Sequence, residues 1–178
     1  GLSSTVFASL GYGVGSSEID RVYFKQARVL AQNKKILLPL DVIVGHKKNK
    51  SDYKHIRITT KPSTLCSSAY AIYDIGPETI RRYAEIIKKA ETIVWNGPMG
   101  VFEQKPYDIG TLAIARVVAT RSKGEAYGVV GGGETVAALK RTHTLPWVDH
   151  VSTGGVAMLE YLGGSSMPGI AALMKNNV

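Results

Sequence analysis

The chain has 178 residues, a net charge of +8, 44% hydrophobic residues and a single cysteine. This length and composition are typical of a globular domain with a sizeable core and exclude an intrinsically disordered chain. A lone cysteine excludes an internal disulfide framework, and no apolar run approaches the ~20 residues of a membrane span. We therefore expect a cytoplasmic protein with no membrane partner. Because the chain opens without Met, we also expect it to be part of a longer protein.

Two helices are predicted in the first half of the chain. Apolar residues recur at helical spacing over residues 18–35, and Ser17 with Asp20 resembles a capping box at the start of that helix. Residues 76–90 show the same period, with Pro77 in the first turn and two lysines near the end. Helix termini favour this arrangement of proline and basic residues.

Strands and a basic loop are predicted between these helices. The apolar run at 35–44 is too short for a long helix and is interpreted as a buried strand with a bend or an end at Pro39. Residues 46–55, HKKNKSDYKH, are interpreted as a solvated loop rather than a nucleic-acid patch, because no RNA- or DNA-binding motif accompanies them. Residues 56–60 are interpreted as a short strand. No nucleic-acid partner is expected.

The second half of the chain alternates between short apolar strands and helices. This pattern predicts a parallel sheet covered on both faces. The fold class is therefore α/β, a Rossmann-like three-layer αβα sandwich with a mainly parallel sheet, in a single domain over residues 1–178. The predicted strands are 92–95, 126–130 and 150–153, and the predicted helices are 110–123, 134–142 and 156–162.

Glycines stand at the ends of all three of these strands. They occur in WNGPMG (95–100), GGGET (131–135) and STGG (152–155). Parallel strands end at one edge of the sheet, where α/β proteins bind ligands. Glycine lets the backbone approach a ligand closely, and the helix that follows offers unpaired N–H groups. The three segments together predict an oxyanion or phosphate site, whereas GYGVGSS (11–17) lacks the last glycine of a dinucleotide fingerprint and is interpreted as a loop.

Several motifs in the same order resemble those of the phosphoglycerate kinase family. They are YDIGPETI (73–80), TIVWNGPMGVFE (92–103), GVVGGGETVAA (128–138) and DHVSTGG (149–155), with KKILLPLDVIVG (34–45) and MPGIAAL (167–173) fitting as well. The resemblance covers nearly the whole chain and is weakest over residues 46–70. It implies a glycolytic enzyme that catalyses ATP + 3-phosphoglycerate = ADP + 1,3-bisphosphoglycerate.

The resemblance further implies that this chain matches only the C-terminal, nucleotide-binding part of a two-domain enzyme. Gly1–Leu2 resembles the end of the family's GGGM segment. The N-terminal domain, which holds the triose-phosphate site, and the lysine-bearing GAKV segment of the family have no counterpart in the chain. We therefore expect the chain alone to be inactive, to bind Mg²⁺ with ADP or ATP, and to be monomeric.

Site residues follow from the resemblance, position by position. Ser152, Thr153, Gly154 and Gly155 match the helix start that stabilises the phosphoryl group in transfer, and Glu134 stands where the family has the aspartate that ligates magnesium. Glu103 matches the residue that binds the ribose hydroxyls. The residues expected to bind the nucleotide are Gly1, Asn96, Pro98, Val101, Glu103, Gly131, Gly132, Gly133, Glu134 and Thr135.

The chain also departs from the family pattern at four positions. Glu134 is one methylene longer than the usual aspartate, and Val156 replaces the third glycine of STGGG. Glu18 and Tyr73 fall where apolar residues line the nucleotide pocket. These departures leave an alternative open: a non-catalytic module that binds a nucleotide or another anion.

Overall fold

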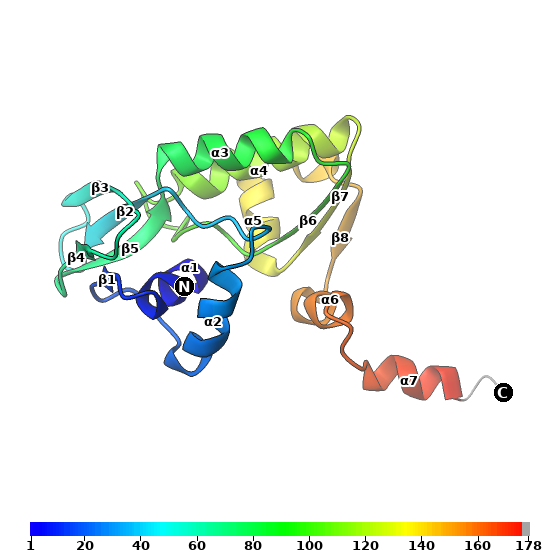
Figure 1. The fold of residues 1–178 in the computed structure, drawn as a ribbon. Helices are drawn as coiled ribbons and strands as arrows, with labels where there is room; N and C mark the ends of the chain where they lie inside the picture. The colour runs from blue at the N-terminus through cyan, green and yellow to red at the C-terminus, as the bar shows by residue number, and fades with distance from the viewer. Residues whose placement is uncertain (176–178) are drawn as a thin grey trace. The chain divides into compact units, whose positions relative to one another are not determined.

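The computed structural model describes residues 1–175, which divide into two compact units (Figure 1). Unit 1 comprises residues 1–85 and 99–114, and unit 2 comprises residues 86–98 together with the chain from 115 onward. This division into units does not test the prediction of a single domain over residues 1–178, which stays a prediction. Among the described residues, no helix combines the length and apolar character needed to cross a membrane.

Unit 1 contains two small sheets and the N-terminal helices. One sheet has the order β3-β2-β5 and is antiparallel, and β1 pairs with β4 in parallel. Helix α3 begins in unit 1 and ends just inside unit 2. The elements are α1 (Leu2–Ser9), β1 (Gly13–Val14), a 3₁₀ turn η1 (Arg21–Tyr23), α2 (Phe24–Ala31), β2 (Asp41–His46), β3 (Tyr53–Arg57), β4 (Thr64–Cys66), β5 (Tyr70–Ile75) and α3 (Pro77–Ile87).

The strand predicted at 35–44 lies further along the chain, because β2 begins only after Pro39 and continues to His46. Its central residues Val42 and Val44 are fully buried. Strand β3 pairs with β2 from Tyr53 to Arg57, so the end of the predicted basic loop is in fact strand. Strand β3 lies at the edge of its sheet, and all of its residues are exposed except the half-buried Ile56, so its sequence lacks the apolar alternation that would predict a strand.

The helix predicted at 18–35 is also shorter, since α2 covers only Phe24–Ala31 behind the turn η1. Asp20 caps this turn by accepting a hydrogen bond from the backbone N–H of Val22, but Ser17 takes no part in a capping box. Its hydroxyl instead donates to the Val14 carbonyl and accepts from the Ile72 N–H. A long-range partner in β5 has therefore replaced the local one.

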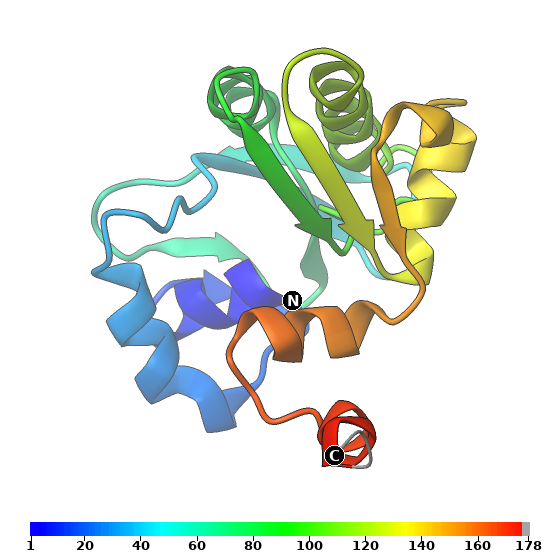
Figure 2. The same ribbon diagram turned by 90° about the vertical axis from the view of Figure 1, so that its right-hand side faces the viewer.

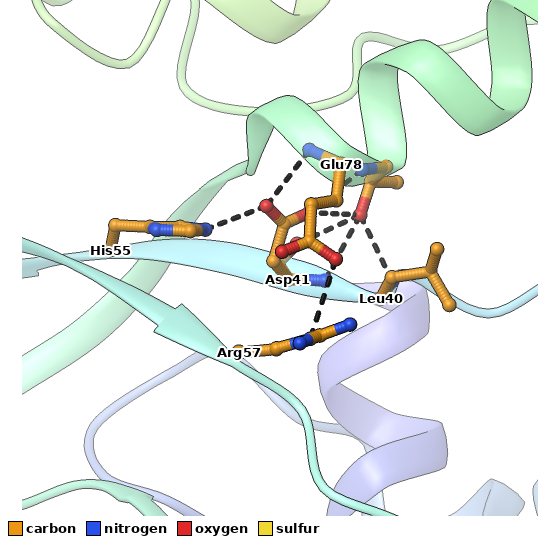
Figure 3. Close-up of polar contacts among 6 residues, drawn as sticks. Leu40, Asp41, His55, Arg57 and Glu78 are labelled. Atoms are coloured by element: carbon orange, nitrogen blue, oxygen red, sulfur yellow. Dashed lines mark hydrogen bonds and ion pairs between the residues drawn. The ribbon is translucent and has the colours of Figure 1, made fainter.

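The buried carboxylate of Asp41 joins β2 to the start of α3 (Figure 3). It accepts hydrogen bonds from the N–H groups of Glu78 and Thr79, at 2.9 and 2.8 Å, and from the Thr79 hydroxyl at 2.6 Å. His55 Nε2 lies 2.6 Å from the same carboxylate. Asp41 thus satisfies first-turn N–H groups that the helix itself leaves unpaired.

Unit 2 is built on the parallel sheet β6-β7-β8, whose strands lie side by side and end at the same edge (Figure 2). The predicted α/β class with mainly parallel pairing is confirmed, and each predicted strand and helix of this half lies within two residues of its expected bounds. The elements are β6 (Thr92–Asn96), α4 (Ile109–Lys123), β7 (Tyr127–Gly131), α5 (Gly133–Arg141), a 3₁₀ turn η2 (Leu145–Trp147), β8 (His150–Ser152), α6 (Gly155–Leu162) and α7 (Pro168–Lys175).

The core of unit 2 forms where the helices meet this sheet. Val118 and Ala119 of α4, Val130 of β7 and Leu139 of α5 are each at most 1% exposed. Gly128 in β7 lets α4 pack closely, because a Cβ at that position would overlap the hydroxyl of Ser122. Right-handed crossovers between neighbouring strands place α4 and α5 on one face of the sheet. This packing holds the carboxyl ends of the strands in fixed register.

Candidate functional site at the glycine-rich sheet edge

The last residues of the three parallel strands are paired with one another. Asn96 is the register partner of Gly131, which is in turn the partner of Ser152. The segments that follow the strands therefore all begin at the same edge of the sheet. They are residues 97–98, 132–135 and 153–155. The structure brings these predicted site residues together at a single edge of unit 2 (Figure 2).

Two hydrogen bonds connect the three segments. The side-chain amide of Asn96 donates to the carbonyl of Gly155 over 3.0 Å, which joins the end of β6 to the start of α6. The N–H of Gly97 donates to the hydroxyl of Thr135 over 2.7 Å, which joins the same strand end to α5. Thr135 is fully buried, so its hydroxyl positions the loop after β6.

The starts of α5 and α6 approach each other so closely that only glycine fits. A Cβ on Gly155 would lie 2.7 Å from the nitrogen and 2.8 Å from the Cα of Gly132. Gly132 itself has φ +89°, a backbone conformation that residues other than glycine rarely adopt. A Cβ added to Gly131 would lie only 2.6 Å from the methyl group of Met158. Met158 is therefore an apolar residue of this edge that the motifs did not predict.

Backbone N–H groups at this edge are available to an anion. Gly132 caps α5 and Gly154 caps α6, and neither helix has a hydrogen bond from a capping side chain. The next residues at the α5 start, Gly133 and Glu134, are exposed. Unpaired first-turn N–H groups and the positive end of the helix dipole attract phosphate oxygens. Two such helix starts in contact form a site suited to a phosphorylated ligand.

The carboxylate of Glu134 is the group at this edge with the chemistry of a magnesium ligand. It lies exposed in the first turn of α5. Among residues 1–175, no group of three or more His, Cys, Asp or Glu side chains is arranged to hold a metal ion. One carboxylate suits Mg²⁺ that arrives with a nucleotide, because such an ion takes its remaining ligands from phosphates and water.

The remaining predicted residues lie mainly in unit 1. Gly1 caps α1 and borders a pocket of about 390 Å³ that also includes Glu18. Val101 donates its N–H to the carbonyl of Tyr73 over 2.8 Å, which holds the GVFE segment along β5, and Glu103 is exposed. Pro98 is the last residue of its stretch of unit 2.

Thr111 contacts the WNGPMG segment, and no sequence motif predicted this. Its fully buried hydroxyl accepts hydrogen bonds from the N–H groups of Met99 and Gly100, at 3.0 and 3.2 Å. It lies in α4, inside an ordinary helical pattern. A threonine on the apolar face of a predicted helix could have indicated this role, because a buried hydroxyl requires a hydrogen-bond partner.

Comparison with known proteins identifies the family. The model of the family described as Phosphoglycerate kinase matches residues 1–165. The phosphoglycerate kinases of Pelotomaculum thermopropionicum and Desulfosudis oleivorans are 39% and 40% identical to the chain, over 98% of the chain and 44% of each relative.

Solved structures show the same likeness. The phosphoglycerate kinase structure from Coxiella burnetii superposes with a TM-score of 0.82 at 36% identity, covering 100% of this chain and 45% of that one. The Pyrococcus horikoshii enzyme gives a TM-score of 0.72 at 32% identity, covering 96% of this chain and 43% of that one. This likeness confirms the three-layer α/β class. The chain spans under half the length of these relatives, and it belongs to the phosphoglycerate kinase family.

Proposed function

We propose that this chain is the Mg-nucleotide-binding part of a phosphoglycerate kinase, which catalyses ATP + 3-phosphoglycerate = ADP + 1,3-bisphosphoglycerate. The observation that carries this proposal is the contact between the glycine-rich starts of α5 and α6, with Gly155 against Gly132 and Asn96 bridging to the Gly155 carbonyl. Phosphoryl transfer depends mainly on positioning and on stabilising the charge of the transferred group. Paired helix starts supply both.

The residues of this edge take separate roles in the proposal. Backbone N–H groups of 132–135 bind the nucleotide phosphates, and Glu134 binds the Mg²⁺ that accompanies them. Ser152, Thr153, Gly154 and Gly155 stabilise the phosphoryl group as its bond to the nucleotide oxygen breaks and its bond to the carboxylate oxygen of 3-phosphoglycerate forms. Gly1, Asn96, Pro98, Val101 and Glu103 contribute to the nucleotide site, Glu103 through the ribose hydroxyls. Magnesium supplies charge neutralisation between the phosphates when it is bound.

A second candidate function is a module that binds a nucleotide or another anion without catalysis. Two observations favour it: Glu134 carries its carboxylate one methylene further from the backbone, and Val156 is 72% exposed in the first turn of α6. In either case we propose a cytoplasmic protein that acts as a monomer. The chain alone is expected to show no turnover, because the family's acyl-phosphate site lies outside the matched part.

Calorimetric titration of Mg-ADP into the 178-residue chain tests the proposal. We expect saturable binding that weakens about tenfold or more in Glu134→Gln, since the variant loses a charged metal ligand. The matched control is Glu91→Gln, an exposed acid just before β6 at the opposite end of the same sheet, which leaves the affinity unchanged.

The outcomes separate the two candidates. Absence of Mg-ADP binding contradicts the kinase and the nucleotide-binding form of the module, and leaves only a module that binds another anion. Binding by the chain, followed by turnover of 3-phosphoglycerate and Mg-ATP in a coupled assay of the longer protein that contains it, supports the kinase. Binding without turnover in that longer protein supports the module. Turnover by the chain alone contradicts the proposed division of the enzyme.

A further inference from the structure

Unit 2 contains a pocket of about 530 Å³ that the proposed kinase function does not use. A volume of this size is typical of sites for small molecules. The turn after α3, the second half of α4 and the turn after α4 form its walls. The lining residues used below are Lys88, Arg116, Val117, Thr120, Arg121 and Gly124, and every residue of the lining belongs to unit 2.

This pocket lies at the opposite end of the parallel sheet from the glycine-rich segments. Lys88 comes four residues before β6 begins, and Glu125 comes two residues before β7 begins. Both strands have five residues and run from this end toward the phosphate site (Figure 2). The two sites are therefore separated by a strand length of about 13 Å. Within the described chain, none of the residues assigned above to the nucleotide lines this pocket.

The guanidinium of Arg121 is held in place by two hydrogen bonds. Its Nε donates to the carbonyl of Ala90 over 2.9 Å, and its Nη1 donates to the carboxylate of Glu125 over 2.7 Å. The Arg121 side chain is only 20% exposed. A guanidinium has five N–H groups, so three remain for a ligand after these two bonds within residues 1–175. Because the group is fixed before a ligand arrives, little side-chain entropy is lost on binding.

Lys88 and Thr120 offer further hydrogen-bond donors to this pocket. Both residues are exposed. Within residues 1–175, the Lys88 ammonium forms no ion pair and the Thr120 hydroxyl forms no hydrogen bond. Glu125 is the one carboxylate among the described residues of the lining, and it already accepts from Arg121. The pocket is therefore rich in donors and poor in acceptors, which suits the oxygens of an anion.

The position of Arg116 distinguishes this pocket from an ordinary basic helix end. Cations in the last turn of a helix, such as Arg121 and Lys123 in α4, are favoured by the helix dipole alone. That effect falls off within the last turn, whereas Arg116 lies seven residues before the end of α4 at Lys123. The dipole therefore does not explain the positive charge that Arg116 adds to the lining.

Two observations favour carboxylates over phosphate as the anionic groups. Arg121 already binds a carboxylate at this place, that of Glu125. In addition, α3 and α4 end beside the pocket, at Ile87 and Lys123, and the carboxyl end of a helix carries partial negative charge. This charge opposes a doubly charged phosphate more than it opposes a singly charged carboxylate.

The arrangement of the lining favours two anionic groups rather than one. Lys88 and Arg121 belong to separate segments, so one small group does not use both cations fully. The half-buried side chain of Val117 and the aliphatic stem of Lys88 add apolar surface. A short carbon skeleton between two carboxylates would cover this surface and let each carboxylate meet a cation.

We propose that this pocket binds a small organic dicarboxylate, with one carboxylate held by Arg121 and the other by Lys88. The Thr120 hydroxyl donates to one of them, and the carbon skeleton packs against Val117. The proposal goes beyond the kinase function, because it adds a ligand that is neither the nucleotide nor the triose phosphate and a site at the other end of the sheet.

Titration of adipate, a dicarboxylate with a flexible carbon chain, into the 178-residue chain tests this inference. Amide chemical shifts are followed by NMR at constant ionic strength, and we expect changes concentrated in residues 86–90 and 116–125. Adipate should bind about fivefold or more tightly than hexanoate, which has the same chain length and one carboxylate, and than inorganic sulfate. Equal affinity for adipate and either of these anions, or changes spread over other basic segments, would overturn the proposal.

Neighbouring lysines provide a matched pair of variants. Lys88→Gln should weaken adipate binding about threefold or more, because it removes one of the two cations that hold the ligand. Lys89→Gln removes the same charge from the next residue, which is exposed and lies outside the pocket lining, and should leave the affinity unchanged. Equal effects of the two variants would show that only the general positive charge of this end matters, and would overturn the site.

Gly124 allows the pocket to be blocked without disturbing the backbone. A Cβ at this position would make only ordinary contacts, 3.5 and 3.7 Å from the carbonyl oxygens of Arg121 and Thr120. Gly124→Glu therefore places a carboxylate in the lining, where it should compete with the ligand and weaken adipate binding about tenfold or more. Gly169→Glu, at a site in α7 where a Cβ meets nothing within 4 Å, is the control. Full adipate affinity in folded Gly124→Glu contradicts the inference.

A final arm separates this pocket from the nucleotide site. Adipate is titrated into the chain saturated with Mg-ADP, and the changes at residues 86–90 and 116–125 are expected to persist. Displacement of adipate by Mg-ADP would overturn the inference and leave the proposed kinase function intact. Failure of Mg-ADP to bind at all would contradict the kinase function and not this pocket.

Discussion

The side-chain amide of Asn96 and the backbone carbonyl of Gly155 are joined by a hydrogen bond of 3.0 Å, although 59 residues separate them in the chain. Asn96 ends β6, and Gly155 begins α6. The bond ties one strand end to the helix start that we assign to phosphoryl stabilisation. Asn96 therefore holds the α6 start in place, in addition to any direct contact with a nucleotide.

Replacing Asn96 with alanine should loosen this edge. We expect Asn96→Ala to lower the free energy of unfolding by about 1 kcal/mol and to weaken Mg-ADP binding about five- to tenfold, since one half-buried hydrogen bond is lost. Calorimetry and chemical denaturation measure the two effects. Asn33→Ala, which removes only a local bond to the Lys35 N–H in unit 1, serves as the control. Equal effects of the two variants on Mg-ADP affinity would contradict the assignment.

Two adjacent glycines of the STGG segment should respond differently to alanine. In Gly155→Ala the new Cβ meets backbone atoms of Gly132 at 2.7–2.8 Å, so the α5 and α6 starts must separate. We expect a loss of about 1–3 kcal/mol in stability. In Gly154→Ala the nearest atom is the Ala157 Cβ at 3.4 Å, and the loss should stay under about 1 kcal/mol. Thermal unfolding of both variants measures the contrast, and similar losses would refute the close packing.

The cap of α3 should depend strongly on the charge of Asp41. Burial alone raises the pKa of Asp41, but the hydrogen bonds from Thr79, Glu78 and His55 outweigh it and hold the pKa below its usual value. Asp41→Asn should therefore lower stability by about 2–3 kcal/mol, because a neutral amide cannot accept all of these bonds.

The matched control for this cap is the neighbouring ion pair between Arg57 and Glu78, which lies 3.3 Å apart (Figure 3). Arg57 is 76% exposed in its side chain, so Arg57→Gln should change stability by less than about 0.5 kcal/mol. Because the pKa of Asp41 is lowered on folding, the cap's contribution is present above the usual aspartate pKa and is lost as pH falls below it. Denaturant titrations of both variants at neutral and acidic pH measure these differences.

Asp74 should give the opposite pH dependence. Burial raises the pKa of Asp74 to about 7, helped by the nearby charge of Asp108 and opposed by hydrogen bonds from the N–H groups of Gly110 and Ile75. The folded protein then holds a proton that the unfolded chain releases near its ordinary value of 3.8. Stability should therefore fall as pH rises from about 4 to about 7, by at most roughly 4 kcal/mol from this group.

Asp74→Asn isolates this effect, because asparagine does not titrate. The difference in unfolding free energy between the original chain and the variant should shift with pH over that interval, in favour of the variant at the upper end. Guanidinium unfolding at several pH values measures this difference. Parallel stability curves for the two proteins would show that Asp74 ionises at its ordinary pKa.

Sequence patterns predicted unit 2 well and unit 1 poorly, for a physical reason. The strands at 92–96 and 127–131 are apolar runs between clear helices, so their burial is encoded locally. Strands β1 and β4 are only two and three residues long, and β3 is an exposed edge. Such segments become strands through their partners, and no periodicity develops over so few residues.

The sequence by itself determined the α/β class, the family and the three glycine-rich strand ends, because buried strands, helix periods and phosphate-binding turns are short-range patterns. Only the tertiary structure decided that Gly155 faces Gly132, that Asp41 caps a helix 36 residues away, and that Tyr107 packs against Gly45 of β2. These contacts join residues far apart in the chain. Their energies come from packing and from satisfying buried polar groups, which depend on where the folded backbone places each group.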